Sequence, residues 1–122
     1  MTTTTAPNPR THDLTIHHHT TGPKGLYYGQ GHISLRRDLG PINHRCTLAH
    51  ETAHHTLGHN PNATGLQATR QEHAADQLAA TWLITETDYR EIEALYGPDT
   101  TTLAHHLAVT HHLINVWRNL HT

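Results

Sequence analysis

The segment TLAHETAHHTLGH, residues 47–59, contains four histidines and one glutamate. Within it, His50, Glu51 and His54 match the pattern HExxH, whose residue types can bind a metal ion and activate a water. Histidine accounts for 16 of the 122 residues, so chance is a serious alternative. A chain of this composition is expected to contain about 0.1 chance matches to HExxH. The motif alone therefore favours a metal site only modestly, and the residues around it have to decide.

A helix would place the side chains of this motif where metal chemistry needs them. The imidazoles of His50 and His54 would project from one helix face, one turn apart, so both can reach one ion. Glu51 would be turned by about 100°, which keeps its carboxylate out of the ligand set but near a water on the metal. A carboxylate at that place can act as a general base, so Glu51 is the predicted catalytic residue.

A third ligand is needed, because a catalytic zinc site typically has three protein ligands and leaves the fourth position to water. Glu72 is the predicted third ligand, since it opens a second helical segment and Asp76 follows it by one turn on the same face. In this ExxxD arrangement, the Asp76 carboxylate is predicted to accept the N–H of a zinc-bound histidine and so fix its tautomer.

His59 is the main alternative as third ligand. In the pattern HExxHxxGxxH the glycine and the last histidine follow the second histidine by three and six residues, whereas Gly58 and His59 follow His54 by four and five. This register favours His59 as a surface or helix-end residue. His55 and His73 are weaker alternatives.

The first element of the predicted framework is a small sheet. Three short segments rich in Ile, Tyr and Thr, residues 13–20, 25–30 and 31–37, are separated by turn-forming stretches. The two hairpin-like connections predict a three-stranded antiparallel sheet.

Helices are predicted in the remainder of the chain. Apolar residues recur at helical spacing from Pro41 to Gly58, so HExxH lies inside a helix. A second helix is predicted at about 69–85, a third from near 87 to Gly97, and two shorter helices around 109–110. Strands followed by helices indicate an α+β fold, with strands in 12–37, active-site helices in 41–85 and C-terminal helices in 87–122.

Length and composition limit the alternatives. A chain of 122 residues is most simply one domain, here 12–122, preceded by a threonine-rich tail, residues 1–11, that is predicted to be disordered. No apolar run long enough for a membrane helix and no signal peptide is present, so we expect a cytoplasmic protein with no membrane partner. Cys46 is the single cysteine, so imidazole and carboxylate groups must hold any metal.

The C-terminal segment LAHHLAVTHHLINVWRNL has the rhythm of a helix-turn-helix, which raises a DNA-binding module as an alternative function. The net charge of −2, and Arg118 as the single Lys or Arg in residues 97–122, argue against nucleic acid as a partner. The apolar residues of this segment are better interpreted as core against the active-site helices: Leu103, Leu107, Val109, Leu113, Val116 and Leu120.

Two further groups could take part in chemistry. Alternation in a strand would put His17 and His19 on one face and His18 on the other, which favours solvated strand residues, with a secondary metal-binding site as the alternative. A phenol from Tyr27 or Tyr28 could stabilise an oxyanion, but alternation makes at least one of them ordinary packing, and we assign neither.

With these motifs the sequence resembles the ImmA/IrrE-like zinc metallopeptidases, small cytoplasmic proteins that act on phage-type or stress-response repressors. The resemblance is carried by four stretches: HISLRR, RCTLAHETAHHTLGH, EHAADQLAATWLI and LAHHLAVTHHLINVWRNL. The second motif of the family looks like ExxAxxFAxxLLMP, from which this chain departs by Leu78, Trp82 and Thr85 in place of Phe, Leu and Pro. Family members usually carry an additional helix before the first strand, which this sequence does not show.

The resemblance implies a small zincin-like domain in which His50, His54 and Glu72 bind Zn²⁺ and Glu51 is the catalytic carboxylate. It also implies an endopeptidase whose substrate is a helix-turn-helix repressor. We expect a substrate strand to pair with an exposed sheet edge at Gly31–Arg36. A zinc-binding interaction protein without turnover is the alternative that keeps the same ligands.

Overall fold

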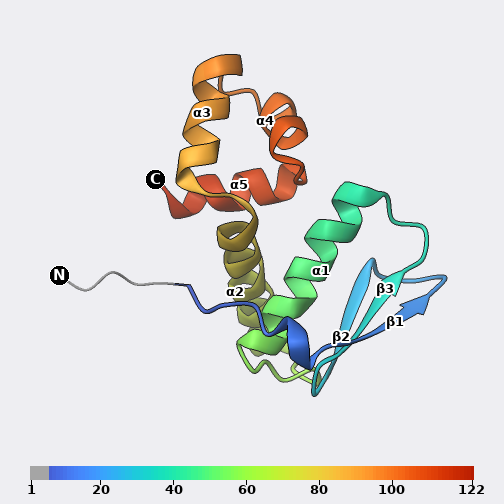
Figure 1. The fold of residues 1–122 in the computed structure, drawn as a ribbon. Coiled ribbons are helices and arrows are strands. Elements are labelled where there is room, and N and C mark those ends of the chain that lie inside the picture. The colour runs from blue at the N-terminus through green and yellow to red at the C-terminus, as the bar shows by residue number, and fades with distance from the viewer. Residues whose placement is uncertain (1–5) are drawn as a thin grey trace.

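A three-stranded sheet precedes a series of helices in the chain (Figure 1). The computed structural model describes residues 6–122. A single 3-10 turn, Thr11–Asp13, leads into the strands β1 (Thr15–His19), β2 (Gly25–Gly29) and β3 (His32–Arg36). The helices are α1 (Pro41–Thr56), α2 (Gly65–Leu83), α3 (Glu86–Tyr96), α4 (Thr100–Leu107) and α5 (His111–Leu120). The predicted α+β order is confirmed.

The sheet is mixed, so the prediction of a fully antiparallel sheet was wrong. Its strand order is β1-β3-β2, with β3 antiparallel to β2 and parallel to β1. The tight connection between β2 and β3 makes that pair a hairpin, as predicted. Strand β3 carries the fully buried Ile33 and Leu35 and takes the central place, and β1 then lies beside β3 instead of β2. Because β1 and β3 both run opposite to β2, their pairing is parallel.

The central place of β3 also overturns the predicted substrate edge at Gly31–Arg36. The backbone of β3 is hydrogen-bonded on both sides, to β1 and to β2, and offers no open edge to a peptide. Within residues 6–122, the outer strands of the sheet are β1 and β2.

Helix α1 lies between the sheet and α2 (Figure 1). It contacts β2 and β3 on one side and α2 on the other, so the HExxH residues lie at the centre of the molecule. Helix α2 begins at Gly65, about four residues earlier than predicted. Its N-cap residue, Thr64, is of a suitable type but makes no capping side-chain hydrogen bond, and the first helical residue, Gly65, has a positive φ of 59°. No helix in residues 6–122 combines the length and hydropathy that a bilayer crossing requires.

The helices α3, α4 and α5 form a group at the C-terminal end of α2 (Figure 1). Each starts at a side-chain cap, provided by Thr85, Asp99 and Thr110 respectively. Arg45 joins α1 to this group, because its Nη1 donates to the carbonyl oxygens of Leu107 (3.2 Å) and Ala108 (2.7 Å), where α4 ends.

The C-terminal segment forms a hydrophobic core, as its apolar pattern predicted. Trp117 stacks with Tyr89 and with His121, whose ring centroids are 4.1 and 3.7 Å away, and its Nε1 donates to the Ile84 carbonyl oxygen at 3.2 Å. Of the six predicted core residues, Leu120 is the exception, since 40% of it is exposed. The others are buried or packed against the core: Leu103, Leu107, Val109, Leu113 and Val116.

The segment preceding the first strand is packed where the structure describes it. Residues 1–5 of the tail that was predicted to be disordered lie outside the described residues. Ala6 packs against a small apolar cluster shared by α1 and α2, and the Pro7 carbonyl oxygen accepts from Trp82 Nε1 at 2.7 Å. The backbone N–H of Arg10 donates to Thr56 Oγ1 at 3.2 Å. The described part of this segment, from Ala6 on, therefore contacts both α1 and α2.

We predict that Trp117→Ala lowers the free energy of unfolding by about 3–5 kcal/mol, because it empties the centre of the helical core and removes two aromatic contacts. Urea unfolding monitored by circular dichroism measures the change. The matched control on the same helix is Leu120→Ala, which is expected to change the free energy of unfolding by less than about 0.5 kcal/mol. Equal effects of the two substitutions would contradict this description of the core.

Candidate metal and active site

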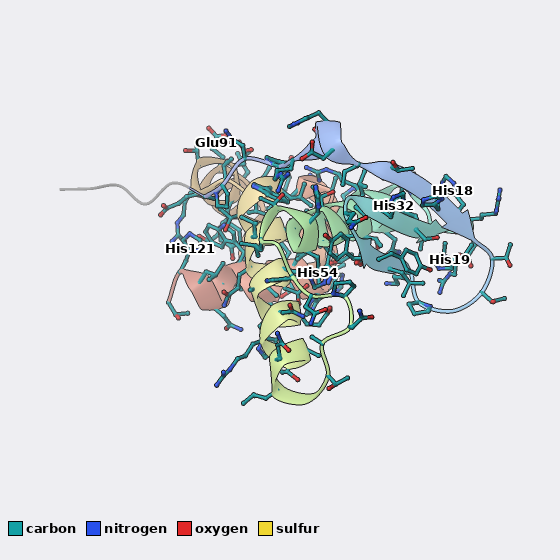
Figure 2. The ribbon with its side chains drawn as sticks, turned by 90° about the horizontal axis from the view of Figure 1, so that it is seen from below. His18, His19, His32, His54, Glu91 and His121 are labelled. Atoms are coloured by element: carbon teal, nitrogen blue, oxygen red, sulfur yellow. The ribbon has the colours of Figure 1, made fainter. Side chains whose placement is uncertain are left out.

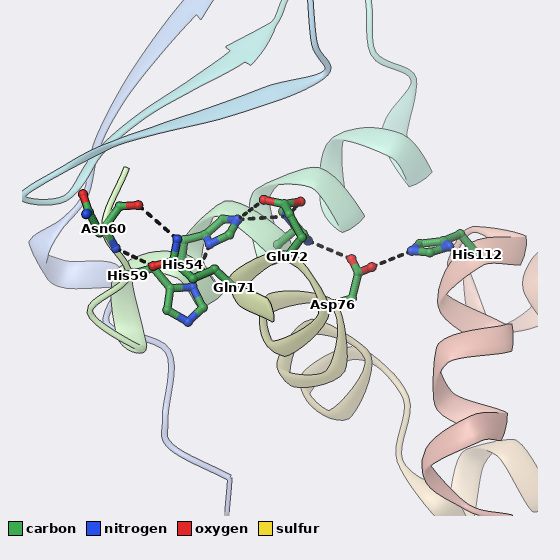
Figure 3. A network of polar contacts seen from close by, with 8 residues as sticks. His54, His59, Asn60, Gln71, Glu72, Asp76 and His112 are labelled. Atoms are coloured by element: carbon green, nitrogen blue, oxygen red, sulfur yellow. Dashed lines mark hydrogen bonds and ion pairs between the residues drawn. The ribbon is translucent and has the colours of Figure 1, made fainter. Parts of the chain in front are cut away.

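Three predicted ligand side chains converge between α1 and α2 (Figure 3). The Nε2 atoms of His50 and His54 lie 3.1 Å apart on one face of α1. The Glu72 carboxylate reaches across from α2, with Oε2 at 3.0 Å from His50 Nε2 and Oε1 at 2.8 Å from His54 Nε2. Glu51 lies beside them, and one donor atom each from His50, Glu51 and His54 fall within 4.8 Å of one another.

The donor set fits a divalent metal ion. Two imidazoles and one carboxylate are a ligand set found in catalytic zinc sites. Around a tetrahedral zinc ion with bonds of about 2.0–2.1 Å, ligand atoms lie roughly 3.4 Å apart. The separations of 2.8–3.1 Å among His50, His54 and Glu72 are close to that spacing, so a small opening of the three side chains suffices.

The outer nitrogen of each histidine has its own partner, which leaves both Nε2 atoms facing Glu72. The Asp76 Oδ1 accepts from His50 Nδ1 at 2.8 Å, which is the contact predicted for Asp76. The Nδ1 atoms of His54 and His59 are 2.8 Å apart. Partners of this kind orient metal-binding imidazoles and set their tautomers.

His59 therefore contacts His54 on its Nδ1 side, whereas Glu72 contacts the same ring on its Nε2 side. Gly58 makes this contact possible, because its positive φ of 66° reverses the chain after α1 and returns His59 toward the helix. The sequence signal was this glycine directly before a histidine, which was interpreted only as a helix end.

A residue that the sequence analysis missed, Gln71, holds the loop after His59 against α2 (Figure 3). The Gln71 Oε1 accepts from the backbone N–H of Asn60 at 2.7 Å, and its Nε2 donates to the Asn60 carbonyl oxygen at 3.0 Å. Gln71 precedes Glu72, so this pair of hydrogen bonds positions the loop and the carboxylate together.

Glu51 is buried where β2 crosses α1. A Cβ atom at Gly25 would lie 2.5 Å from Thr47 Cγ2 and 2.9 Å from Glu51 Cγ and Oε2, so only glycine permits this approach. Glu51 is 6% exposed, and this burial raises its pKa to about 7, with the Glu72 and Asp76 charges adding to the shift and His50 opposing it. A carboxyl group with such a pKa can both accept and return a proton near neutral pH.

In the metal-free site, the pKa values of His50 and His54 are shifted in opposite directions. Burial lowers the pKa of His50, but hydrogen bonds to Asp76 and Glu72 more than offset it and raise that pKa to about 10. Burial, together with the charge on His50, lowers the pKa of His54 to about 4. A bound cation would replace the proton held by His50, because metal ligands bind in their deprotonated form.

Cavities open on both sides of Glu51. One of about 380 Å³ is lined by Lys24, Asn43, Thr47 and His112, among others, and one of about 230 Å³ by Tyr27, His59 and Glu72, among others. Gly25 and Glu51 line both cavities. A peptide bound along β2 would therefore pass next to the carboxylate of Glu51.

Neither tyrosine considered as an oxyanion donor points a free hydroxyl at the site. The ring of Tyr27 stacks on His54, with centroids 6.0 Å apart, while its hydroxyl lies 3.2 Å from Nδ1 of the buried His55. Tyr28 is 57% exposed.

The histidine run at 17–19 lies on the sheet, apart from the metal site (Figure 2). His17 Nε2 is 3.0 Å from His32 Nδ1, and His19 Nδ1 is 2.7 Å from Ser34 Oγ, so both His17 and His19 contact β3 on one face. His18 is exposed. The alternation predicted for this strand is present.

Comparison with known protein families finds a match over most of the chain. The peptidase family described as the IrrE N-terminal-like domain (Peptidase_M78) matches residues 6–116. Comparison with curated proteins finds no match. The matched region runs from the N-terminal segment to α5 and includes the predicted ligands and Glu51. The chain therefore belongs to the family of IrrE N-terminal-like domains, whose activity is of the metallopeptidase type.

Proposed function

We propose that the protein is a zinc-dependent endopeptidase. The observation that carries the proposal is the convergence of His50, His54 and Glu72 beside the buried Glu51, at a cleft bordered by β2. Zinc held by these three ligands supplies polarisation of a peptide carbonyl and activation of a water.

Glu51 is the proton carrier of the proposed reaction. Its carboxylate accepts a proton from the attacking water and returns it to the leaving amine, so that no charged amide anion has to leave. The raised pKa of about 7 suits both transfers, since the group is neither too weak as a base nor too weak as an acid near neutral pH. Asp76 and His59 hold the two imidazoles in place during the reaction.

Strand β2 replaces Gly31–Arg36 as the proposed docking edge for the substrate. Within the described residues, β2 pairs only with β3, so its other edge is open. Its residues Gly25, Leu26 and Tyr27 line the cavity that also contains Glu51 and Glu72. An extended peptide paired with this edge would lie beside Glu51, and its backbone hydrogen bonds would not depend on its side chains.

We propose a cytoplasmic helix-turn-helix repressor as the substrate. The support is the resemblance to repressor-directed peptidases and membership of the IrrE N-terminal-like family. The open cleft is a second support, because a small site makes few contacts and gains selectivity from a docked partner.

DNA binding by the C-terminal helices has little support. Arg118 is the single Lys or Arg in residues 97–122, and its guanidinium is used internally. It donates to Tyr89 Oη at 2.8 Å, to Thr100 Oγ1 at 2.6 Å and to the Pro98 carbonyl oxygen. A guanidinium held in this way cannot also neutralise a phosphate without breaking the helical core.

The first test is Glu51→Gln, which is expected to abolish cleavage and leave zinc bound, because the residue handles a proton and is not a ligand. Cleavage assays and metal analysis of the purified variant measure both properties. Glu91→Gln, at an exposed carboxylate of α3, is the matched control and should retain full activity. Activity in the Glu51 variant would remove this mechanism, and an inactive wild-type protein that binds zinc would favour the interaction protein without turnover.

The second test concerns the ligand from α2. Glu72→Ala is expected to lose zinc to a competing chelator that the wild-type protein resists, because it removes one of three ligands. The neighbouring His73→Ala is the control, since His73 is exposed on the same helix. Full zinc retention by Glu72→Ala would show that a residue other than Glu72 is the third ligand.

The third test concerns the substrate. Casein, as an unfolded generic protein, is expected to be cut slowly or not at all, whereas a helix-turn-helix repressor encoded beside this gene should be cut at one or a few sites in a zinc-dependent way. Gel electrophoresis and mass spectrometry of the products identify the cleavage sites. Rapid degradation of casein with the repressor intact would leave the reaction standing and refute the proposed partner.

A further inference from the structure

A histidine from the helical group reaches the metal site from the side opposite His59 (Figure 3). His112 Nε2 donates to Asp76 Oδ2 at 2.7 Å, while Asp76 Oδ1 accepts from His50 Nδ1 at 2.8 Å. Both oxygens of the Asp76 carboxylate are therefore held by imidazoles, one from α1 and one from α5. The continuous chain His112–Asp76–His50 joins α5 to the ligand set.

The backbone that carries His112 is held firmly in place. Thr110 caps α5 by accepting from the Leu113 backbone N–H at 3.2 Å, which fixes where the first turn of the helix begins. Val109 and Leu113, on either side of His112 in the sequence, are buried in the helical core. The helix start is thus a rigid support for a side chain directed at Asp76.

The high exposure of the His112 side chain indicates that it does not serve core packing. Its side chain is 67% exposed, whereas that of Asp76 is 19% exposed. Since His112 buries little surface, its contact with Asp76 contributes little apolar packing. What the contact does provide is direction, because a carboxylate held at one oxygen can turn about its Cβ–Cγ bond, and one held at both oxygens cannot.

We propose that His112 is a positioning residue for the metal site: by holding the second oxygen of Asp76, it fixes the orientation of His50. This inference rests on the ligand set of the proposed function. The effect should be smaller than that of losing Asp76 itself, for which a cost of about 10–100-fold in metal affinity is typical. For His112 we expect about 3–10-fold, since it acts one contact further from the ligand.

Zinc affinity of the full chain, measured by competition with a chromogenic chelator, tests the proposal without any activity assay. His112→Ala is expected to weaken zinc binding about 3–10-fold. His112→Gln should restore most of the affinity, because its amide nitrogen can take the place of Nε2, whereas the shorter His112→Asn should not. The control is His111→Ala, an exposed histidine on the same helix turn, which should bind zinc like the wild-type protein.

A double-mutant cycle with Asp76 tests whether the effect passes through the carboxylate. If it does, the pair Asp76→Ala with His112→Ala binds zinc no more weakly than Asp76→Ala alone. The visible absorption of cobalt bound in place of zinc should change in His112→Ala and not in His111→Ala, because the orientation of His50 changes. A general loss of stability would not be reversed by glutamine, and thermal unfolding of the metal-free variants checks for it directly.

Two failures are distinguishable. A wild-type protein that binds no zinc would overturn the ligand set, and with it both the proposed function and this inference. A wild-type protein that binds zinc, with His112→Ala equal to His111→Ala or with additive effects in the cycle, would overturn the role of His112 alone.

Discussion

Close packing of α1 on α2 is the constraint on which the site depends. The contact is made by Ala53 and Ala75, which are fully buried, and by Leu78, which is 7% exposed. Small side chains let two helices approach closely, and this approach brings the imidazoles of one helix within hydrogen-bonding distance of the carboxylates of the other. A larger residue at either alanine would separate His50 from Glu72, because a packed interface cannot absorb additional volume without moving its backbone.

The same approach collects charged groups in a partly buried place, where unpaired charges are costly. Most of these groups are paired: His50 lies between Glu72 and Asp76, and His54 lies between Glu72 and His59. Among residues 6–122, Glu51 has no such side-chain partner, and its burial without one raises its pKa. The carboxyl groups of one site thus differ in pKa because Glu51 is buried close to the negative charges of Glu72 and Asp76, whereas those two are paired with histidines.

The parts of the chain outside α1 and α2 keep this arrangement in place. Strand β2 covers Glu51 and can do so only because Gly25 has no side chain. On the other side, Arg45 joins α1 to the end of α4, and the helical group packs around Trp117. The C-terminal helices therefore support a site to which their own sequence shows no obvious relation, and α5 contacts the candidate metal ligands through His112 and Asp76.

Much of this protein could be predicted from its sequence, because the signals are local. The spacing of His50 and His54 by one helical turn, the ExxxD pair on α2 and the breaks at Gly58 and Gly97 each depend on residues a few positions apart, where periodicity and backbone preference act. The sequence accordingly indicated the strands, the helices and the residues that come together as the candidate ligands. The match to the IrrE N-terminal-like family over residues 6–116 agrees with the family resemblance of these motifs.

Only the tertiary structure decided which distant segments meet. Strand β3 lies at the centre of the sheet because it is the most deeply buried strand, and turn residues do not encode the burial of a strand. The open edge beside Glu51 is therefore that of β2. The contacts of His59 with His54, of Gln71 with Asn60 and of His112 with Asp76 likewise depend on how helices dock. In a chain with 16 histidines, sequence spacing can identify two that share a helix face. Selecting a third and a fourth histidine from other elements requires knowledge of how the whole fold packs. The reason is that the separation of residues along the chain carries no information about their distance in space.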